Sequence, residues 1–472
     1  MYEDIYYFSF TEALKNAKLN NKVVAKNGIV EATQICYYDG YYDNSNIPEN
    51  CIGVPNTEFV KYFSNTSLRL PNVCNVDGTS LDVKDEEQNF LSNLELVNKI
   101  RENITKELEV KIKSQKINFS DKHLRIFAHA CRETVLIKYV TKNIIESFEK
   151  LGFTVFLHQQ KSEFESCNKY SYLESLYNFN PHVTININHM QNQFLNDNVF
   201  NFVWFQDLMP ILTNEIDFNL RKRDFIFSLL EDFDKLLYKK GIPKEKLFRQ
   251  PITTSERLYN NKYNVVRENK IVFIGDSFQG QFENRKNESL IIKEIQEKLN
   301  LNQKINFDEI VSTFEIDINY LKLVLYPAVL RQEIVSWTCK QKLVSVEIYG
   351  RGWENINFAD NFYKGILPYG EEIAKVYNSA KYSIVISPNS YYQQRLFEMS
   401  LCGTIPLIYD DYINNEEFRY KDNAFLFSTY EEMFSCLDKE PKENPELIGK
   451  KNTYEKFANK ILKIIEDNIV NN

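Results

Sequence analysis

The sequence predicts an α/β protein built from two Rossmann-like doubly wound domains, preceded by an N-terminal accessory segment. Short apolar runs alternate with amphipathic helical runs in two series, which is typical of parallel sheets covered by helices on both faces. A polar stretch at residues 249–269, with neither period, separates the two series and predicts a linker. At 472 residues the chain is also longer than one hydrophobic core usually serves.

These patterns divide the chain into four parts. We expect an accessory region at 1–120, an N-terminal domain at 121–265, a C-terminal domain at 266–445 and a closing helix at 446–472. The accessory region contains tyrosine-rich turns and then an amphipathic helical run, "DEEQNFLSNLELVNKIRENITKELEVKIKSQK". No chemistry is visible in it, so we expect a partner-binding role, with a homo-oligomer formed through 1–120 as one form of it.

The first series begins with "LRIFAHA", which predicts a strand, followed by a helix that ends near Gly152. "FTVFLH", "PHVTININ" and "NVFNFVWFQD" predict three further strands. The run "FIFSLLEDFDKLLYKKG" predicts a helix ending at Gly241. This helix carries Asp232 and Asp234, a D-x-D pair that we interpret as solvated surface and not as a metal site.

The second series begins with the strand "KIVFIGDS" and continues through the strands "LVSVEIYGRG", "KYSIVISP" and "TIPLIYD". The helices "GEEIAKVYNSA" and "YYQQRLFEMSLC" lie between them, and a helical run from about 446 closes the chain. The linker at 249–269 and this closing run are the segments able to cross between the domains, so we predict that they form a hinge.

Composition and charge exclude several functional classes. Apolar residues make up 43% of the chain and charged residues 26%, as in a folded globular protein. The net charge is -8 and no long basic run occurs, so a nucleic-acid partner is not expected. No signal peptide and no apolar run long enough for a transmembrane segment are visible, and we expect a cytoplasmic protein.

The eight cysteines lie far apart, without a C-x-x-C pair and without histidine at metal-ligand spacing. They are Cys36, Cys51, Cys74, Cys131, Cys167, Cys339, Cys402 and Cys436. We expect reduced, mostly buried thiols and no zinc site.

Glycine is scarce, with 14 residues in the chain, and seven of them fall in the second series. "FIGDSFQGQ" places Gly275 directly after a strand, and "IYGRGW" does the same with Gly350 and Gly352. Backbone N–H groups and a helix N-terminus at such places can hold phosphate oxygens. Neither motif is a complete phosphate-binding signature, so for either motif alone a tight turn is the alternative.

The stretch "SPNSYYQQRLFEMSLCGTIPLIYD" predicts a strand end, a turn at Pro388, Asn389 and Ser390 that caps a helix, a stop at Gly403 and another strand.

Arg395 and Glu398 share one face of that helix. One interpretation is an exposed ion pair worth a few tenths of a kcal/mol. The other is a ligand site in which Glu398 accepts hydrogen bonds from a ribose diol and Arg395 meets a diphosphate.

The same stretch resembles the strand, turn, R-x-x-E helix, glycine and apolar strand of the group 1 glycosyltransferases with the GT-B fold, particularly the spore-coat CgeB-like branch. "KIVFIGDSFQGQFENR" and "VEIYGRGWENINFADNFYKGILPYGEEIAKVYNSAKYSIVIS" match companion segments of that family. The resemblance covers about residues 120–460 and is strongest over 270–412. It implies transfer of a sugar from a nucleotide-sugar donor to an acceptor glycan, protein or other surface-glycoconjugate precursor.

The resemblance also implies roles by position. Glu398 would bind the ribose, and Arg395 with the turn at Asn389 and Ser390 would bind the diphosphate. The base would be contacted by Leu367, Pro368 and Tyr369, and the phosphates would lie near Gly275 and Arg285. Such enzymes usually need no metal or other cofactor, because cationic side chains and helix dipoles neutralise the leaving diphosphate.

One position departs from the family pattern. Many retaining members carry a second glutamate eight residues before the one matched by Glu398, and Ser390 stands there in this chain. The contact to the donor sugar and the stereochemical class, retaining or inverting, are therefore both open. The same departure leaves two alternatives to a transferase: a non-catalytic GT-B-like binding or scaffold protein, and a nucleotide-sugar epimerase on the same fold.

If the enzyme inverts, a catalytic base should come from the strand ends of the N-terminal domain. The candidates are His129 and Glu133 after the first strand, His189 after "TININ" and Asp207 in "WFQDLMP". A structural role is the alternative for each histidine, and shaping of the acceptor site is the alternative for Asp207. Abundant Lys, Asn, Ile and Tyr suggest AT-rich codons, as in many bacteria that make surface glycans.

Overall fold

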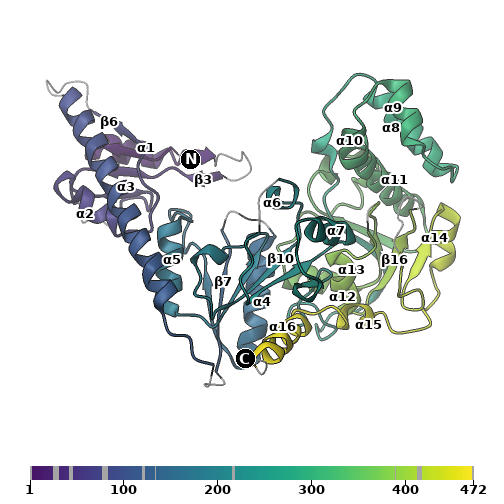
Figure 1. Ribbon diagram of the computed structural model, residues 1–472. Helices are drawn as coiled ribbons and strands as arrows, with labels where there is room; N and C mark the ends of the chain where they lie inside the picture. The colour runs from purple at the N-terminus through teal and green to yellow at the C-terminus, as the bar shows by residue number, and fades with distance from the viewer. Residues whose placement is uncertain are drawn as a thin grey trace. The chain divides into compact units, whose positions relative to one another are not determined.

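Figure 1 shows a computed structural model that describes residues 3–24, 31–41, 46–76, 83–119, 123–132, 134, 136–214, 218–388, 390–411 and 417–469. The chain divides into a first unit, Met1–Gln250 with Ile461–Asn472, and a second unit, Pro251–Lys460. Two predicted site residues, Glu133 and Asn389, lie outside the described residues. Among the helices of the described ranges, none combines the length and apolar character that crossing a membrane requires.

A small parallel sheet forms the start of the first unit, and we call residues 3–76 the N-terminal module. Its strands are β1 (Ile5–Tyr7), β4 (Cys36–Tyr38), β5 (Cys51–Gly53) and β6 (Val73–Asn75), in the order β5-β4-β1-β6. β2 (Lys22–Val24) pairs with β3 (Glu31–Thr33), and α1 (Phe10–Lys18) and α2 (Phe59–Ser64) complete the module. The tyrosine-rich segment that begins at Cys36 was predicted as a turn but supplies core residues: Tyr37 is fully buried and Tyr38 is 2% exposed.

The long helix α3 (Val83–Ser114; Figure 1) contributes residues to two hydrophobic cores. Phe90 and Val97 pack into the core of the N-terminal module. About three turns further on, Leu108 and Ile112 pack against α5 (Lys169–Phe179) in a core beneath the next sheet. The predicted amphipathic helix is confirmed, and it joins the N-terminal module to the rest of the first unit.

The main sheet of the first unit has six parallel strands in the order β12-β11-β10-β9-β7-β8. The strands are β7 (Arg125–His129), β8 (Thr154–His158), β9 (Val183–Ile187), β10 (Phe200–Phe205), β11 (Asp224–Ser228) and β12 (Leu247–Arg249). The α-helices around them, besides α5, are α4 (Ile137–Lys150), α6 (Pro210–Thr213) and α7 (Glu231–Lys239).

The helix predicted to begin at Phe225 is wrong in its first half. Residues 224–228 form strand β11, and the helix α7 begins only at Glu231. Phe225 lies against Phe202 of the neighbouring strand, with ring centroids 5.5 Å apart, while Ile226 packs on the opposite face with Leu237 of α7. A strand buried on both faces has an unbroken apolar run, and periodicity alone does not separate such a run from a buried helix.

The second unit contains a five-stranded parallel sheet in the order β14-β13-β15-β16-β17. The strands are β13 (Glu268–Ile274), β14 (Ser345–Tyr349), β15 (Ala380–Val385), β16 (Ile405–Tyr409) and β17 (Phe425–Phe427). The α-helices are α8 (Glu288–Asn300), α9 (Phe307–Phe314), α10 (Ile318–Tyr320), α11 (Tyr326–Lys340), α12 (Glu371–Ser379), α13 (Gln394–Leu401), α14 (Tyr430–Cys436), α15 (Glu446–Lys450) and α16 (Tyr454–Ile469).

Alternate strand residues of this sheet face two different cores. Ile271 and Phe273 of β13 lie in the core that includes α8 and α11, whereas Val272 and Ile274 lie in the core that includes α12 and α13. Helices therefore cover both faces, as in the first unit. The predicted fold class, α/β with two Rossmann-like doubly wound sheets, is confirmed.

The first strand of each large sheet lies between the second and third strands along the chain. β7 lies between β8 and β9, and β13 lies between β14 and β15. The chain order reverses at these strands, and in doubly wound sheets ligands bind beyond the carboxyl ends of the strands at such a switch point. The residues that follow β7, β9, β13 and β15 are therefore the first place to look for function.

The stretch predicted as a linker is largely part of the second unit. Tyr259 is fully buried in the core that contains α12 and α13, and Ile252 and Leu258 pack against the same core. The chain passes between the units at Gln250 and Pro251, and again at Lys460 and Ile461 within α16. The sequence did not predict these buried side chains, because residues 249–269 are mostly polar and isolated apolar residues show no periodicity.

Candidate functional site

Helix α13 starts later than predicted and stops where predicted. Its N-cap is Gln393, which makes no side-chain cap bond, so the prediction that the turn at Ser390 caps the helix is wrong. The Ser390 hydroxyl instead accepts a hydrogen bond from the backbone N–H of Tyr392 at 3.1 Å, and the Tyr391 hydroxyl bonds to Asp410 after β16. These contacts hold the segment after β15 in a non-helical conformation.

The end of α13 is a Schellman motif around Gly403. The glycine has a φ of 73°, and its N–H donates to the carbonyl of Ser400 at 2.8 Å, while the N–H of Thr404 donates to the carbonyl of Met399 at 3.1 Å. The left-handed conformation at Gly403 turns the chain into β16. The Arg267 side chain donates to the carbonyl of Cys402, which satisfies another helix-end acceptor.

Arg395 and Glu398 form an ion pair on this helix in which the carboxylate is buried and the Arg395 side chain is 35% exposed. Arg395 Nη1 lies 2.7 Å from Glu398 Oε2, and the Glu398 side chain is 1% exposed. Gln394 Nε2 donates to the other carboxylate oxygen at 2.8 Å. Burial raises the pKa of the Glu398 carboxyl, and the donors from Arg395 and Gln394 oppose that rise. The interpretation of an exposed surface pair does not fit, because the carboxylate has no contact with bulk water.

Aromatic side chains surround the pair. The Gln394 amide is 3.5 Å from the Tyr369 hydroxyl, and the Tyr369 ring lies 6.2 Å from the ring of Tyr259. Burial acts to lower the pKa of Arg395, but the carboxylate of Glu398 and then the hydroxyls of Tyr377 and Tyr259 raise it above its usual value. Arg395 is therefore fully charged. The structure brings together three of the predicted ligand residues, Tyr369, Arg395 and Glu398.

The two glycine motifs meet at the carboxyl ends of β13 and β14. A Cβ atom at Gly350 would lie 2.1 Å from the carbonyl oxygen of Gly275, and one at Gly352 would lie 2.3 Å from the hydroxyl of Ser277. Trp353 Nε1 donates to the Gly275 carbonyl at 2.7 Å, and the backbone N–H of Ser277 donates to the carbonyl of Arg351 at 2.9 Å. Glycine is required here because two loops touch through their backbones.

Arg331 on α11 belongs to this site and was not predicted from the sequence. Its Nη1 donates to the carbonyl of Asp276 at 2.9 Å, and its guanidinium lies 3.9 Å from the ring centre of Phe278. Burial lowers the pKa of Arg331 to about 10, and Asp276 opposes that change. The side chain is charged at neutral pH and lies beside the loop at Asp276. A guanidinium in such a place can bind phosphate oxygens through charge-assisted hydrogen bonds. No signal within "YPAVLRQEIV" distinguishes it from a helix-surface arginine.

The remaining predicted donor residues are less closely joined. Leu367 packs at the edge of the core that holds Tyr369. Arg285 pairs with Glu283 at 2.7 Å and stacks 3.8 Å from the ring centre of Tyr320. Its side-chain contacts are therefore with its own loop and α10, and its role at the phosphates stays a prediction. The role of Pro368 at the base also stays a prediction.

In the first unit, the histidine candidates lie at the switch point of the six-stranded sheet. His129 ends β7, and His189 follows β9 with an exposed side chain. His129 Nδ1 is 2.8 Å from His158 Nδ1, and its Nε2 faces Cys167 Sγ at 3.6 Å and Cys131 Sγ at 3.8 Å. Burial, and then His129, lowers the pKa of His158 to about 4, so His158 is neutral. Both ring nitrogens of His129 are engaged.

Among the candidate bases, Asp207 has an exposed side chain whose carboxylate is held in one orientation by a hydrogen bond. Asn188 Nδ2 donates to Asp207 Oδ2 at 2.7 Å, and Asn188 Oδ1 accepts the backbone N–H of Gln206 at 2.8 Å. Asn188 follows β9, so two neighbouring strand ends fix this carboxylate. Of the D-x-D pair, Asp232 is solvated surface as predicted and lies 2.9 Å from Lys235 of the same helix. Asp234 is not: its side chain is largely buried, pairs with Arg249 of β12 and accepts a hydrogen bond from the Ser228 hydroxyl.

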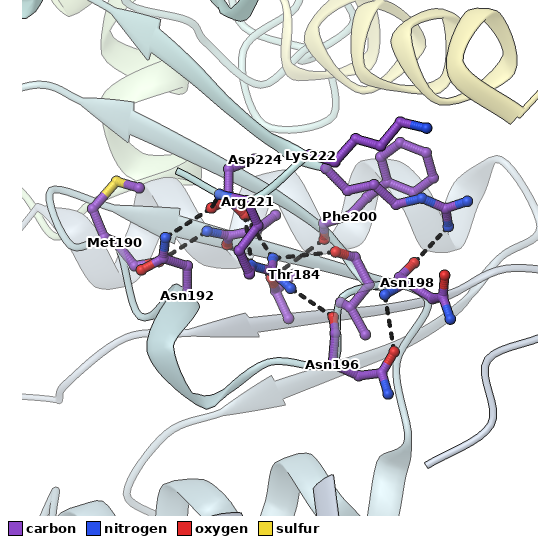
Figure 2. Close-up of polar contacts among 12 residues, drawn as sticks. Thr184, Met190, Asn192, Asn196, Asn198, Phe200, Arg221, Lys222 and Asp224 are labelled. Carbon is purple, nitrogen blue, oxygen red and sulfur yellow. Dashed lines mark hydrogen bonds and ion pairs between the residues drawn. The ribbon is translucent and has the colours of Figure 1, made fainter. Parts of the chain in front are cut away.

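A polar network also lies in the first unit, at the opposite ends of the strands (Figure 2). Asp224 begins β11 and binds Arg221 at 2.6 Å, and Asn192 donates to the same carboxylate at 2.7 Å. Thr184 donates to Asn201 at 2.8 Å. A cavity of about 340 Å³ lies beside Arg221. Because Arg221 binds Asp224 and backbone carbonyls, the network stabilises the connection between β9 and β10, which contains a short 3-10 helix at Asn192–Phe194.

A match to a known protein family covers the part of the chain that contains most of the candidate site of the second unit. Residues 331–460 match the family model described as "Glycosyl transferase-like", which covers less than a third of the chain. That segment begins at Arg331 and includes Gly350, Arg395 and Glu398. The predicted resemblance to glycosyltransferases is confirmed at this level and over these residues. No curated protein matches the chain.

Three of the solved structures that are similar to the chain have low sequence identity to it. Sucrose-phosphate synthase from Thermosynechococcus elongatus has 9% identity and a TM-score of 0.46, over 74% of this chain and 100% of the other. A glycosyltransferase from Rickettsia africae has 10% identity and a TM-score of 0.47, over 74% and 100%. Anabaena Alr3699/HepE in complex with UDP-glucose has 9% identity and a TM-score of 0.42, over 73% and 99%.

Proposed function

We propose that this chain is a nucleotide-sugar-dependent glycosyltransferase whose donor binds at the carboxyl ends of the second unit's strands. The observation that carries the proposal is the buried pair of Arg395 and Glu398, which the family match includes. Burial of a carboxylate costs free energy unless hydrogen-bond donors satisfy its oxygens. The two hydroxyl groups of a ribose are donors that a carboxylate accepts.

The donor diphosphate would lie between the glycine loops and two arginines. Gly275, Gly350 and Gly352 let the two loops pack closely beyond the strand ends, and Arg331 and Arg395 supply positive charge. The bond between the anomeric carbon and the diphosphate oxygen breaks as the acceptor oxygen attacks, and the arginines stabilise the charge that develops on the leaving group. We propose that this step requires no metal ion, because the cations of the protein serve the same purpose.

Leu367, Pro368 and Tyr369 are proposed to contact the base, and Ser390 the diphosphate. Asp207 is proposed as the base that takes the acceptor proton if the reaction inverts, with His189 as the alternative. Membership of the spore-coat CgeB-like branch, a cytoplasmic location and an acceptor among bacterial surface glycans or proteins are part of the same proposal. Anomeric configuration of the product, measured by NMR, separates inversion from retention.

The test combines a panel of nucleotide sugars with a ribose probe. Slow hydrolysis or transfer with one donor supports the enzyme, whereas neither turnover nor nucleotide binding across the panel contradicts it and favours a scaffold protein. Product analysis reveals an epimerase. For the active nucleotide, removal of the ribose 2′- or 3′-hydroxyl should weaken binding by about 30-fold or more.

Glu398→Gln should bind the intact nucleotide about 30-fold more weakly, and it should no longer distinguish it from the deoxyribose analogue. Glu372→Gln is the matched control, because Glu372 also pairs at i,i+3 but is 51% exposed on α12. Equal discrimination by wild type and Glu398→Gln would remove the ribose from the proposed role of this carboxylate.

A further inference from the structure

A second group of reactive side chains lies in the first unit and plays no part in the proposed function. His129, Cys131 and Cys167 place one nitrogen and two sulfur atoms within 4.8 Å of one another. We call these three residues the His–Cys cluster. His129 ends β7, Cys131 follows two residues later, and Cys167 comes from the loop between β8 and α5. All three side chains are partly exposed, so the cluster is accessible from solvent.

The hydrogen bonds of His129 decide which ring nitrogen carries its proton. Nδ1 lies 3.3 Å from the carbonyl oxygen of His158 and 2.8 Å from His158 Nδ1. A carbonyl oxygen can only accept, so we assign the hydrogen to Nδ1, which can then donate to this carbonyl or to His158 Nδ1. Nε2 then has a free lone pair, and this is the atom that faces both sulfurs. Histidines that bind metals are oriented in the same way, by donating the other ring N–H to a backbone carbonyl or a similar acceptor.

The distances around Nε2 match those of a tetrahedral cation site. With metal–nitrogen bonds of about 2.0 Å and metal–sulfur bonds of about 2.3 Å, nitrogen and sulfur ligands are about 3.6 Å apart. Nε2 lies 3.6 Å from Cys167 Sγ and 3.8 Å from Cys131 Sγ. The two sulfurs are 2.7 Å apart and must separate by about 1 Å, which a small rotation about Cα–Cβ supplies.

The loop that carries Cys167 is held in place by the N-terminal module. The N–H of Ser166 donates to the carbonyl of Ser67 at 2.8 Å, and the N–H of Arg69 donates to the carbonyl of Phe164 at 2.9 Å. On the other side, the N–H of Arg132 donates to Gln160 Oε1 at 2.8 Å. Gln160 belongs to the same β8–α5 loop as Cys167, so this hydrogen bond ties the segment of Cys131 to the loop of Cys167. The two cysteines are therefore held beside each other before any ligand binds.

We propose that His129, Cys131 and Cys167 bind a borderline-soft divalent cation, Zn²⁺ in the first instance, with a solvent molecule as the fourth ligand. Two thiolates and one imidazole are ligands that Zn²⁺ prefers, and three protein ligands leave one position open. A disulfide between the cysteines fits less well. It has no hydrogen to give to Nε2, so the lone pair that faces the sulfurs would lose its partners.

The test is metal binding by the full chain, purified with a reductant and stripped with a chelator. Titration with Co²⁺ should give one equivalent per chain and a thiolate-to-Co²⁺ charge-transfer band in the near ultraviolet, and Zn²⁺ should abolish that band by displacement. Zn²⁺ should also raise Tm, since it binds only the folded chain. A spectrum without a thiolate band, or a stoichiometry far below one, overturns the proposal, and this result needs no variant.

Variants locate the site. Cys131→Ser, Cys167→Ser and His129→Gln should each weaken Zn²⁺ binding by about 100-fold or more, while Cys74→Ser, a partly exposed cysteine of the same unit, should leave it unchanged. Unchanged affinity in both Cys131→Ser and Cys167→Ser overturns the assignment. So does a Cys131–Cys167 disulfide, detected by mass spectrometry, that persists in the reductant. Loss of donor hydrolysis bears on the proposed function alone, because none of these readouts uses a nucleotide.

Discussion

Gly350 shows how a single hydrogen in place of a side chain keeps the candidate phosphate site assembled. Its φ is 134°, and a Cβ atom there would meet the carbonyl of Gly275 at 2.1 Å. Gly350→Ala should lower the free energy of unfolding by about 3 kcal/mol, from the unfavourable φ and the clash together. Gly365→Ala, with φ of 101° and no atom within 4 Å, should cost about 1 kcal/mol.

Gly280→Ala is the control, because Gly280 has an ordinary φ and no atom within 4 Å of the added Cβ. It should change stability by less than about 0.5 kcal/mol. Urea unfolding of the three variants gives the comparison. Equal stabilities for Gly350→Ala and Gly280→Ala would mean that the two loops can separate without cost.

The buried pair of Arg395 and Glu398 makes a second prediction at the residue scale. Arg395→Ala removes the cationic partner of the buried Glu398 carboxylate and leaves it with neutral donors such as Gln394, so the free energy of unfolding should fall by about 3 kcal/mol. Adding Glu398→Gln should recover part of that loss, since a neutral amide tolerates burial better than a charge. Lys375→Ala, which breaks an exposed pair, should cost less than about 0.5 kcal/mol. Additive losses in the double variant would contradict a coupled pair.

At the scale of one element, α3 is predicted to be required by both of the cores that it enters. Leu108→Ala and Val97→Ala should each destabilise the chain by about 2–4 kcal/mol, because both side chains are buried. Val110→Ala should be nearly neutral, because Val110 is 69% exposed on the same helix.

Truncation separates the two roles of α3. A chain that starts at residue 98 keeps Leu108 and Ile112 against α5, whereas a chain that starts at residue 119 uncovers Leu173 and Leu176. The first should remain monodisperse in size-exclusion chromatography and the second should aggregate. If the chain that starts at residue 119 is equally monodisperse, the predicted boundary of the accessory region at residue 120 is also the boundary of a unit that folds without it. The interpretation that α3 is required by both cores would then be wrong.

At the scale of the whole molecule, the second unit is expected to bind donor without the first. Its sheet and both of its cores are formed within residues 251–460, and so are the glycine loops, Arg331, Arg395 and Glu398. A fragment of these residues should fold, and it should bind the nucleotide identified in the panel within about 10-fold of the full chain, measured by calorimetry. Transfer to an acceptor should be absent. A folded fragment with no affinity would place the donor outside this unit.

Local chemistry in the sequence determined much of the second unit. Three features were visible in segments of about ten residues, in which periodicity and turn preference act. They are the apolar run in "KYSIVISP", the helix end at Gly403 and the glycines after β13 and β14. The fold class followed from the alternation of such windows. The pair of Arg395 and Glu398 could also be found, because i,i+3 spacing on a helix places the side chains together.

Tertiary structure alone decided which distant residues meet and how deeply they are buried. Arg331 reaches the loop at Asp276 from another helix, Tyr259 enters the core from a polar stretch, and Cys167 meets His129 across 38 residues of chain. The N-terminal sheet consists of strands only three residues long, too short for any period to be visible. Such contacts depend on which strands pair and which helices pack, and the free energy of that choice is shared by the whole core and is not encoded at any one position.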